Sequence, residues 1–209
     1  MTQPKPTPDY SFETDAQAAG LLRVAGVDEV GRGPLAGPVT AAAVVLDPAH
    51  IPDGLNDSKL LTPKRRVALL EQLLEHADVS VAHASVQEID QHNILRASHI
   101  AMVRAIQGLQ TPPDLALIDG NMVPDGLNIP AKTLVKGDMR SVSIAAASIA
   151  AKIARDEIMQ QLATQFPGYG WENNAGYPTP AHKAALVELG VTPHHRHSFK
   201  PVHNILYQE

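Results

Sequence analysis

Short apolar runs alternate along this chain with longer segments in which apolar residues recur every three or four positions. Five of the short runs are rich enough in β-branched and aliphatic residues to predict strands, at residues 21–27, 39–46, 79–86, 115–118 and 129–135. A short connection rich in Gly and Pro separates the first two runs, which favours an antiparallel pair.

The segments with three-to-four periodicity predict helices. Thr62 followed by Pro63 is typical of a helix N-terminus, and the apolar positions continue that helix through Leu74. Three further helices are expected over residues 93–109, 141–166 and 179–190. The resulting order, β-β-α-β-α-β-β-α-α, predicts an α/β fold in which helices flank a mixed sheet.

The chain has 209 residues, enough for one domain with a sizeable core. Its polar start, with prolines at positions 4, 6 and 8, predicts a disordered tail over residues 1–20 and a single domain over residues 21–209. No apolar stretch approaches the roughly 18–20 residues of a membrane span, and no secretory signal pattern opens the chain. We therefore expect a monomeric, cytoplasmic protein with no membrane contact.

Composition limits the chemistry. The absence of Cys excludes disulfides and thiolate metal sites, so any metal must bind oxygen or imidazole. Seventeen basic against 22 acidic residues give a net charge of −5, so any surface for nucleic acid must be local. The segment 194–197, with three His around Arg196, is either such a phosphate-binding patch or a solvated terminus.

Acidic residues follow three of the predicted strands: Asp28 with Glu29, then Asp119, then Asp138. Strand ends border the crevice in which open α/β sheets bind ligands, so we expect these acids to converge. Crowded carboxylates repel each other unless protons or cations intervene. Oxygen ligands suit Mg²⁺ or Mn²⁺, and two such ions roughly 3.5–4 Å apart serve phosphodiester cleavage.

Each acid also has a structural interpretation. Asp is common in turns, so Asp119 or Asp138 alone could simply begin a loop. Asp28 and Glu29 are harder to explain in this way, because they directly follow an apolar strand. Adjacent strand residues point to opposite faces, so both side chains reach one cluster only if the strand is bulged or ends there. Otherwise Glu29 contributes its carbonyl or supports another ligand.

Six ordered blocks of sequence carry a resemblance to a known family. Residues 27–39, VDEVGRGPLAGPV, closely resemble the N-terminal signature of the type 2 ribonucleases H, the ribonuclease HII family. The other similar blocks lie within residues 56–60, 117–121, 136–152, 176–182 and 196–202. Together they cover nearly everything from residue 22 to residue 203.

The resemblance implies a ribonuclease-H-like mixed sheet flanked by helices, with a C-terminal helical extension. It implies an endoribonuclease that cleaves RNA in RNA–DNA hybrids and single ribonucleotides in duplex DNA, leaving 3′-hydroxyl and 5′-phosphate ends. Such an enzyme would serve ribonucleotide and RNA-primer removal. The alternatives are another nuclease of the same fold and a non-catalytic nucleic-acid-binding module.

Carried over position by position, the resemblance assigns two sets of residues. The catalytic, metal-binding acids would be Asp28, Glu29, Asp119 and Asp138, holding two Mn²⁺ or Mg²⁺ ions at turnover. The nucleic-acid contacts would be Gly31, Arg32, Gly33, Lys59 and Tyr177. The loop of residues 31–33 and Tyr177 would recognise the RNA-to-DNA junction, and Lys59 would hold backbone phosphate.

Physical arguments sharpen these roles. Glycines let the backbone approach a sugar closely, and the 2′-hydroxyl is what distinguishes RNA from DNA. Arg32 either forms a bidentate hydrogen bond with phosphate or an ion pair with a nearby acid. Tyr177 lies in an irregular Gly/Pro segment where it can stack on a sugar or base. The resemblance implies a basic residue at the position of Ala175 in many relatives, so the phosphate binding expected there is weaker in this chain. Residues 155–157 are expected on the solvated side of their helix.

Overall fold

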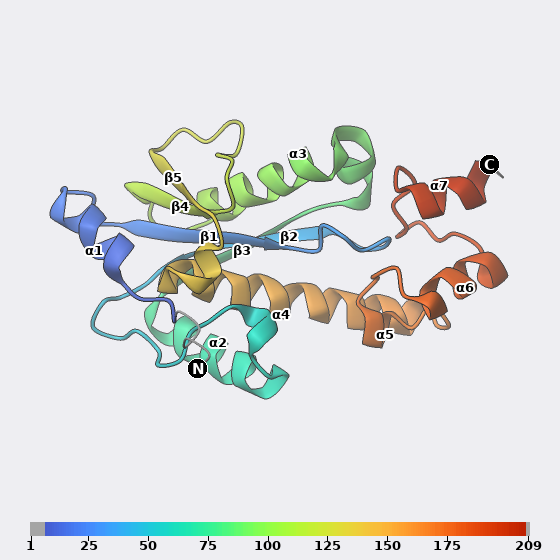
Figure 1. The fold of residues 1–209 in the computed structure, drawn as a ribbon, viewed down its shortest axis with the longest axis horizontal. Helices are drawn as coiled ribbons and strands as arrows, with labels where there is room; N and C mark the ends of the chain where they lie inside the picture. Colours follow the sequence, from blue (N-terminus) through green and yellow to red (C-terminus); the bar gives the residue numbers. More distant parts are fainter. Residues whose placement is uncertain (1–6, 208–209) are drawn as a thin grey trace, which may run out of the picture.

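A five-stranded mixed sheet forms the centre of the computed structural model, which describes residues 7–207 (Figure 1). The strands are β1 (Val24–Val30), β2 (Val39–Val45), β3 (Asp78–Ala84), β4 (Leu115–Asp119) and β5 (Ala131–Leu134). Their order is β3-β2-β1-β4-β5, with β1 antiparallel to β2 and parallel to β4. The predicted α/β fold and its antiparallel first pair are confirmed.

Helices cover both faces of this sheet. They are α1 (Ser11–Ala18), α2 (Pro63–His76), α3 (Val86–Gln107), α4 (Val142–Gln165), α5 (Trp171–Asn174), α6 (Pro180–Leu189) and α7 (Lys200–Tyr207). Helix α3 lies on one face, and α2 and α4 lie on the other (Figure 1). Helices α5, α6 and α7 gather at the far end of α4 and form the expected C-terminal extension (Figure 1). No helix within residues 7–207 has the length and apolar character needed to cross a membrane.

Close packing of β1 on α4 positions the middle of the sheet. A β-carbon on Gly26 would lie only 2.1 Å from the backbone carbon of Ser143, so the strand and the helix meet backbone to backbone. The small side chains of α4, among them Ala146, Ala147 and Ala150, permit this approach along the helix. Asp28 follows Gly26 by two residues, and side chains two apart on a strand share a face.

The start of the chain departs from the prediction. Residues 11–18 form α1 rather than a disordered tail, and Glu13 on that helix is fully buried. The Glu13 carboxylate accepts hydrogen bonds from the hydroxyls of Ser141 and Ser143 at the start of α4. The expectation of disorder is therefore wrong for this part of the chain, and residues 1–6 lie outside the described residues.

The observed boundaries of helices and strands differ from the predicted ones where helix capping or strand pairing determines them. Strand β1 extends to Val30 instead of residue 27, because its pairing with β2 continues to Thr40. Helix α3 begins seven residues earlier than predicted, since Ser85 and Glu88 form a capping box, and it kinks at Asn93 (φ 66°). The predicted N-terminus of α2 is confirmed, with the Thr62 hydroxyl accepting the Arg65 N–H.

Two short 3₁₀ helices complete the part of the fold that carries the predicted site residues. They are η1 (Ser58–Leu60) and η2 (Gly137–Met139). Each lies in a loop that packs against α4.

Candidate active site

The four acids predicted to converge lie at one edge of the sheet. Asp28 and Glu29 sit near the end of β1, Asp119 is the last residue of β4, and Asp138 lies in η2. Because β1 and β4 are parallel neighbours, their carboxyl ends meet at the same edge. The acids line one pocket of about 190 Å³.

The same pocket collects all five residues predicted to contact nucleic acid. Besides the four acids and Val30, its lining residues are Gly31, Arg32, Gly33, Lys59 and Tyr177. Nine of the ten lining residues were therefore predicted to act together, although they come from five separate segments of the chain.

Asp28 is the most deeply placed of the acids, with 7% of its surface exposed. Its Oδ1 accepts the Glu29 N–H at 2.7 Å. Burial, followed by the carboxylates of Glu29, Asp119 and Asp138, raises the pKa of Asp28 well above its ordinary value. The pocket thus concentrates more negative charge than its own cations neutralise.

Glu29 pairs with Arg32 across a short loop, with 3.1 Å between Arg32 Nη1 and Glu29 Oε1. Burial raises the pKa of Glu29, and the Arg32 guanidinium opposes this shift. Arg32 was expected either to bind phosphate or to pair with an acid, and in the structure it forms the ion pair with Glu29. Both Asp28 and Glu29 line the pocket, because β1 ends at Val30 and the pocket spans the end of the strand.

Asp119 is tied to the loop that carries Asp138. Asp119 Oδ1 accepts the Gly137 N–H at 2.7 Å, which fixes η2 beside the end of β4. Burial and the carboxylates of Asp119 and Asp57 raise the pKa of Asp138, while Lys59 acts in the opposite direction. Within residues 7–207, the backbone engages one oxygen of Asp119, and the other accepts no hydrogen bond.

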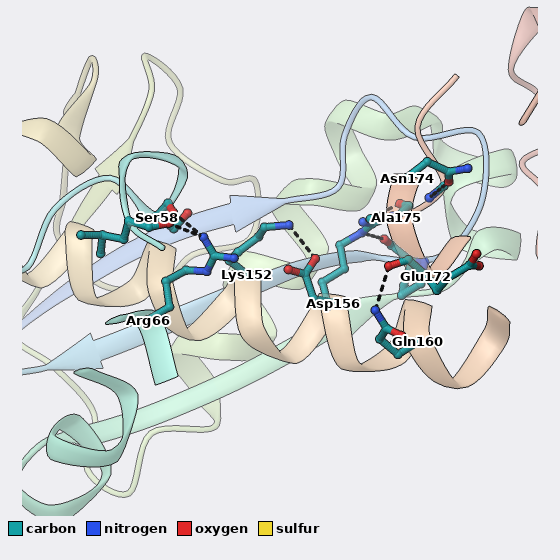
Figure 2. A network of polar contacts seen from close by, with 12 residues as sticks. Ser58, Arg66, Lys152, Asp156, Gln160, Glu172, Asn174 and Ala175 are labelled. Carbon is teal, nitrogen blue, oxygen red and sulfur yellow. Dashed lines mark hydrogen bonds and ion pairs between the residues drawn. The ribbon is translucent and has the colours of Figure 1, made fainter. Parts of the chain in front are cut away.

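Lys59 is held over the acids by its own loop. The Ser58 N–H donates to Ser148 Oγ at 3.1 Å, and Arg66 Nη1 donates to the Ser58 carbonyl at 2.9 Å (Figure 2). Burial acts to lower the pKa of Lys59, but the carboxylates of Asp57, Asp28 and Asp138 outweigh it and raise the pKa. Lys59 is therefore a positive charge beside the acidic cluster.

The donor set fits divalent cations by charge and by atom type. Clustered carboxylates with raised pKa values are stabilised by a cation, and oxygen ligands suit Mg²⁺ and Mn²⁺. Among residues 7–207, however, no three acidic or His side chains already stand close enough together to enclose a metal ion. In this geometry a cation would be held by one or two carboxylates, with water as its remaining ligands.

Tyr177 stands at the mouth of the pocket. Its side chain is 40% exposed, and it faces the glycine loop across the position where a Gly33 side chain would begin. Ala175, which lacks the basic side chain expected in many relatives, adopts a left-handed conformation (φ 47°). Its carbonyl accepts a hydrogen bond from Arg155.

The segment 194–197 is not the basic surface patch considered from the sequence. His195 and Arg196 are fully buried, and burial lowers the pKa of His195 to about 3, so this imidazole is neutral. His195 packs in an aromatic cluster with Trp171 and His182, in which Trp171 Nε1 donates to His182 Nε2 at 3.0 Å. Local charge counting failed for these two residues because they pack inside the C-terminal extension, whereas His197 is exposed.

Arg155 is likewise buried, contrary to the expected solvated position. One signal in the sequence could have located it. Ala151, Arg155 and Met159 recur at intervals of four, and the first and last are buried, so the arginine lies on the buried stripe of α4.

Comparisons with known proteins agree with this arrangement. A family model described as Ribonuclease HII matches residues 25–202. A protein of Ruegeria sp. (strain TM1040) named Ribonuclease HII is 68% identical over 202 residues, which cover 97% of this chain and 88% of that protein.

Solved structures share the fold. The ribonuclease H2 of Pyrococcus horikoshii OT3 aligns with a TM-score of 0.74 at 28% identity, over 89% of this chain and 98% of that one. The Bst-RNase HIII solved in complex with Mn²⁺ aligns with a TM-score of 0.72 at 21% identity, over 91% of this chain and 71% of that one. The mixed sheet and its flanking helices are thus common to this chain and these nucleases.

Proposed function

Since this chain belongs to the ribonuclease HII family, endoribonucleases that act on RNA–DNA hybrids, we propose that its acidic pocket binds divalent cations and also cleaves at single ribonucleotides in duplex DNA. The family assignment confirms the resemblance found in the sequence, and the alternative of a non-catalytic module is set aside. The roles of the individual residues, the metal ions and the junction substrate are the parts of the proposal that require tests.

In this proposal Asp28, Glu29, Asp119 and Asp138 hold two Mg²⁺ or Mn²⁺ ions at turnover. Such cations supply activation of the attacking water and stabilisation of charge on the phosphate. Asp119 presents one oxygen to the pocket while the Gly137 N–H orients the other.

Two positively charged side chains then act on the substrate. Lys59 attracts the backbone phosphate from the side of η1. Arg32 restrains Glu29 through its ion pair and keeps its remaining N–H groups for phosphate. The products are a 3′-hydroxyl and a 5′-phosphate.

Recognition of the ribonucleotide is assigned to the loop and the ring at the pocket mouth. Gly31, Arg32 and Gly33 bring backbone polar groups within reach of a 2′-hydroxyl. Tyr177 stacks on the sugar that follows the ribonucleotide. Both elements border the pocket that contains the acids, so recognition and cleavage act on adjacent positions of one strand.

The observation that carries the proposal is the convergence of four acids and five candidate nucleic-acid contacts in one pocket. The test is cleavage of a labelled DNA duplex containing one ribonucleotide, with Mg²⁺, Mn²⁺ or EDTA, beside a continuous RNA–DNA hybrid. We expect cleavage of both substrates with either metal and none with EDTA. Asp119→Asn, which removes a ligand charge at nearly constant volume, is expected to abolish it.

Two outcomes would contradict the proposal. Turnover in excess chelator would exclude the metal requirement. Cleavage of the continuous hybrid with no cleavage at the isolated ribonucleotide would exclude junction recognition while leaving the family activity intact.

A further inference from the structure

Two arginines lie fully buried beneath the loop of residues 31–38, hereafter the glycine loop. Arg155 comes from α4, and Arg196 comes from the C-terminal extension. Burial lowers the pKa of Arg155 to about 10 and that of Arg196 to about 9, values at which both remain charged at neutral pH. Within residues 7–207, neither forms an ion pair with an acid.

Backbone carbonyls take the place of acidic partners. Arg196 donates to four of them: Nε to Gly37 at 3.0 Å, Nη1 to Arg32 at 3.0 Å, and Nη2 to Gly31 at 2.6 Å and to Pro38 at 3.2 Å. All four carbonyls belong to the glycine loop. A buried guanidinium is costly unless its N–H groups are bonded, so the charge and the loop conformation depend on each other.

Arg155 joins the glycine loop to the segment that carries Tyr177. It donates from Nε to the Pro38 carbonyl at 3.0 Å, from Nη2 to Ala36 at 3.1 Å, and from Nη1 to Ala175 at 3.0 Å. Figure 2 shows Ala175 alongside α4, the helix from which Arg155 reaches the Ala175 carbonyl. This side chain therefore joins the loop to the tyrosine segment, alongside the Leu35 N–H, which donates to the Gly176 carbonyl at 2.7 Å.

The Arg196 bonds also set the direction of two peptide groups. In a trans peptide the C=O and the following N–H point in opposite directions. Because the carbonyls of Gly31 and Arg32 point inward to Arg196, the N–H groups of Arg32 and Gly33 point outward. Within residues 7–207 neither N–H has an acceptor, and both residues line the pocket of the four acids.

We propose that Arg155 and Arg196 are positioning residues for substrate recognition: they fix the glycine loop and the Tyr177 segment as one surface and present the Arg32 and Gly33 N–H groups to an oxygen of the substrate strand. This inference rests on the proposed junction recognition. The arginines touch no substrate themselves. They act through the backbone that they hold.

Substitution by Lys tests the inference, because it keeps the charge but cannot donate a planar fork of N–H groups. We expect Arg196→Lys and Arg155→Lys to lower kcat/KM for a duplex with one ribonucleotide by roughly tenfold or more, since positioning errors of this kind carry such costs. Cleavage inside a continuous hybrid, which requires no junction contact, is expected to fall much less.

Arg23→Lys is the matched control. Arg23 also bridges separate segments, through Asp78 at 2.7 Å and the Thr111 carbonyl at 3.1 Å, and it does not line the pocket. It is expected to lower the melting temperature without changing the ratio of kcat/KM for the two substrates. An unchanged ratio in both buried-arginine variants, at temperatures where they are folded, would overturn the inference.

A measurement on the wild-type enzyme covers the case in which the variants fail to fold. With EDTA present to prevent cleavage, we expect the Arg32 and Gly33 amides to exchange hydrogen rapidly in the free protein and to be protected by the single-ribonucleotide duplex. No protection despite binding would overturn the inference. Failure of the wild type to cleave that duplex at all would instead refute the proposed function.

Discussion

Gly33 faces the ring of Tyr177: a β-carbon on Gly33 would lie 3.4 Å from Tyr177 Cε1, an ordinary van der Waals distance. Gly31 faces the other way. Its φ is +92°, and a β-carbon there would lie 2.1 Å from Nε of the buried Arg155. Two glycines of one short motif thus serve different purposes, one toward the pocket and one toward the packed arginine.

The two glycines are expected to respond differently to the same substitution. Gly33→Ala leaves the interior untouched, so it should melt within a few degrees of the wild type while impairing cleavage at a ribonucleotide by narrowing the gap at Tyr177. Gly31→Ala forces a strained backbone and a clash with Arg155, which should cost about 1–3 kcal/mol of unfolding free energy. Thermal denaturation and single-turnover cleavage measure both effects. Wild-type cleavage by folded Gly33→Ala would show that the substrate does not approach this face of the loop.

Tyr177 is predicted to act on the junction rather than on hybrids in general. Tyr177→Ala should lose about 1–3 kcal/mol of interaction with a single-ribonucleotide duplex, a typical stacking contribution, and Tyr177→Phe should lose less. Cleavage inside a continuous hybrid should be affected much less. The measurement is kcat/KM on both substrates, with Tyr207→Ala as the control, since that exposed tyrosine of α7 is not part of the pocket. Equal losses on both substrates would assign Tyr177 to folding or general binding.

The convergence of the acids could be predicted from the sequence because they lie at or shortly after strand ends that can be located. Apolar runs placed the end of β4 at Asp119 and the end of β1 close to Glu29, and a mixed sheet brings such ends to one edge. The N-terminus of α2 was equally predictable, since Thr62 and Pro63 carry the capping signal locally.

Interactions between distant segments were not predictable in this way. Glu13 is buried because Ser141 and Ser143, nearly 130 residues later, donate to it, and no local pattern shows this. Arg196 lies in a segment that resembles a surface patch by composition, yet its partners are carbonyls about 160 residues earlier. Backbone acceptors leave no trace in the sequence, so nothing in its own segment marks Arg196 as buried.

Helix α1 is predicted to stabilise the domain through Glu13. Glu13→Ala removes the acceptor of two buried hydroxyls at the start of α4, which should cost about 1–3 kcal/mol of unfolding free energy. Asp15→Ala on the same helix is the control, because Asp15 is exposed and its side chain has no hydrogen-bond partner in the described part of the chain. Urea denaturation compares the two variants. Equal stability would mean that α1 contributes nothing through this contact and that the buried hydroxyls find other acceptors.

For Asp28, rising pH and bound metal are predicted to act in opposite directions on the stability of the wild type relative to Asp28→Asn. Its pKa is raised in the folded protein by burial and by the carboxylates of Glu29, Asp119 and Asp138. Above its unfolded pKa of about 3.9, the native state therefore binds more protons than the unfolded state, and the free energy of unfolding falls as pH rises through the raised pKa. Asp28→Asn has no ionisable carboxyl at this position, so its stability lacks this dependence on pH.

In EDTA, the stability of Asp28→Asn relative to the wild type should therefore increase as pH rises from about 4, and then level off once Asp28 is ionised in the folded wild type. At neutral pH, Mg²⁺ or Mn²⁺ should make the wild type the more stable of the two proteins. A cation that binds only the native carboxylates stabilises the wild type by mass action. Melting curves of both proteins across pH, with and without metal, give the result. A difference in unfolding free energy that is constant with pH would mean that the pKa of Asp28 is not raised in the folded protein. A difference that is insensitive to metal would mean that Asp28 is not a metal ligand.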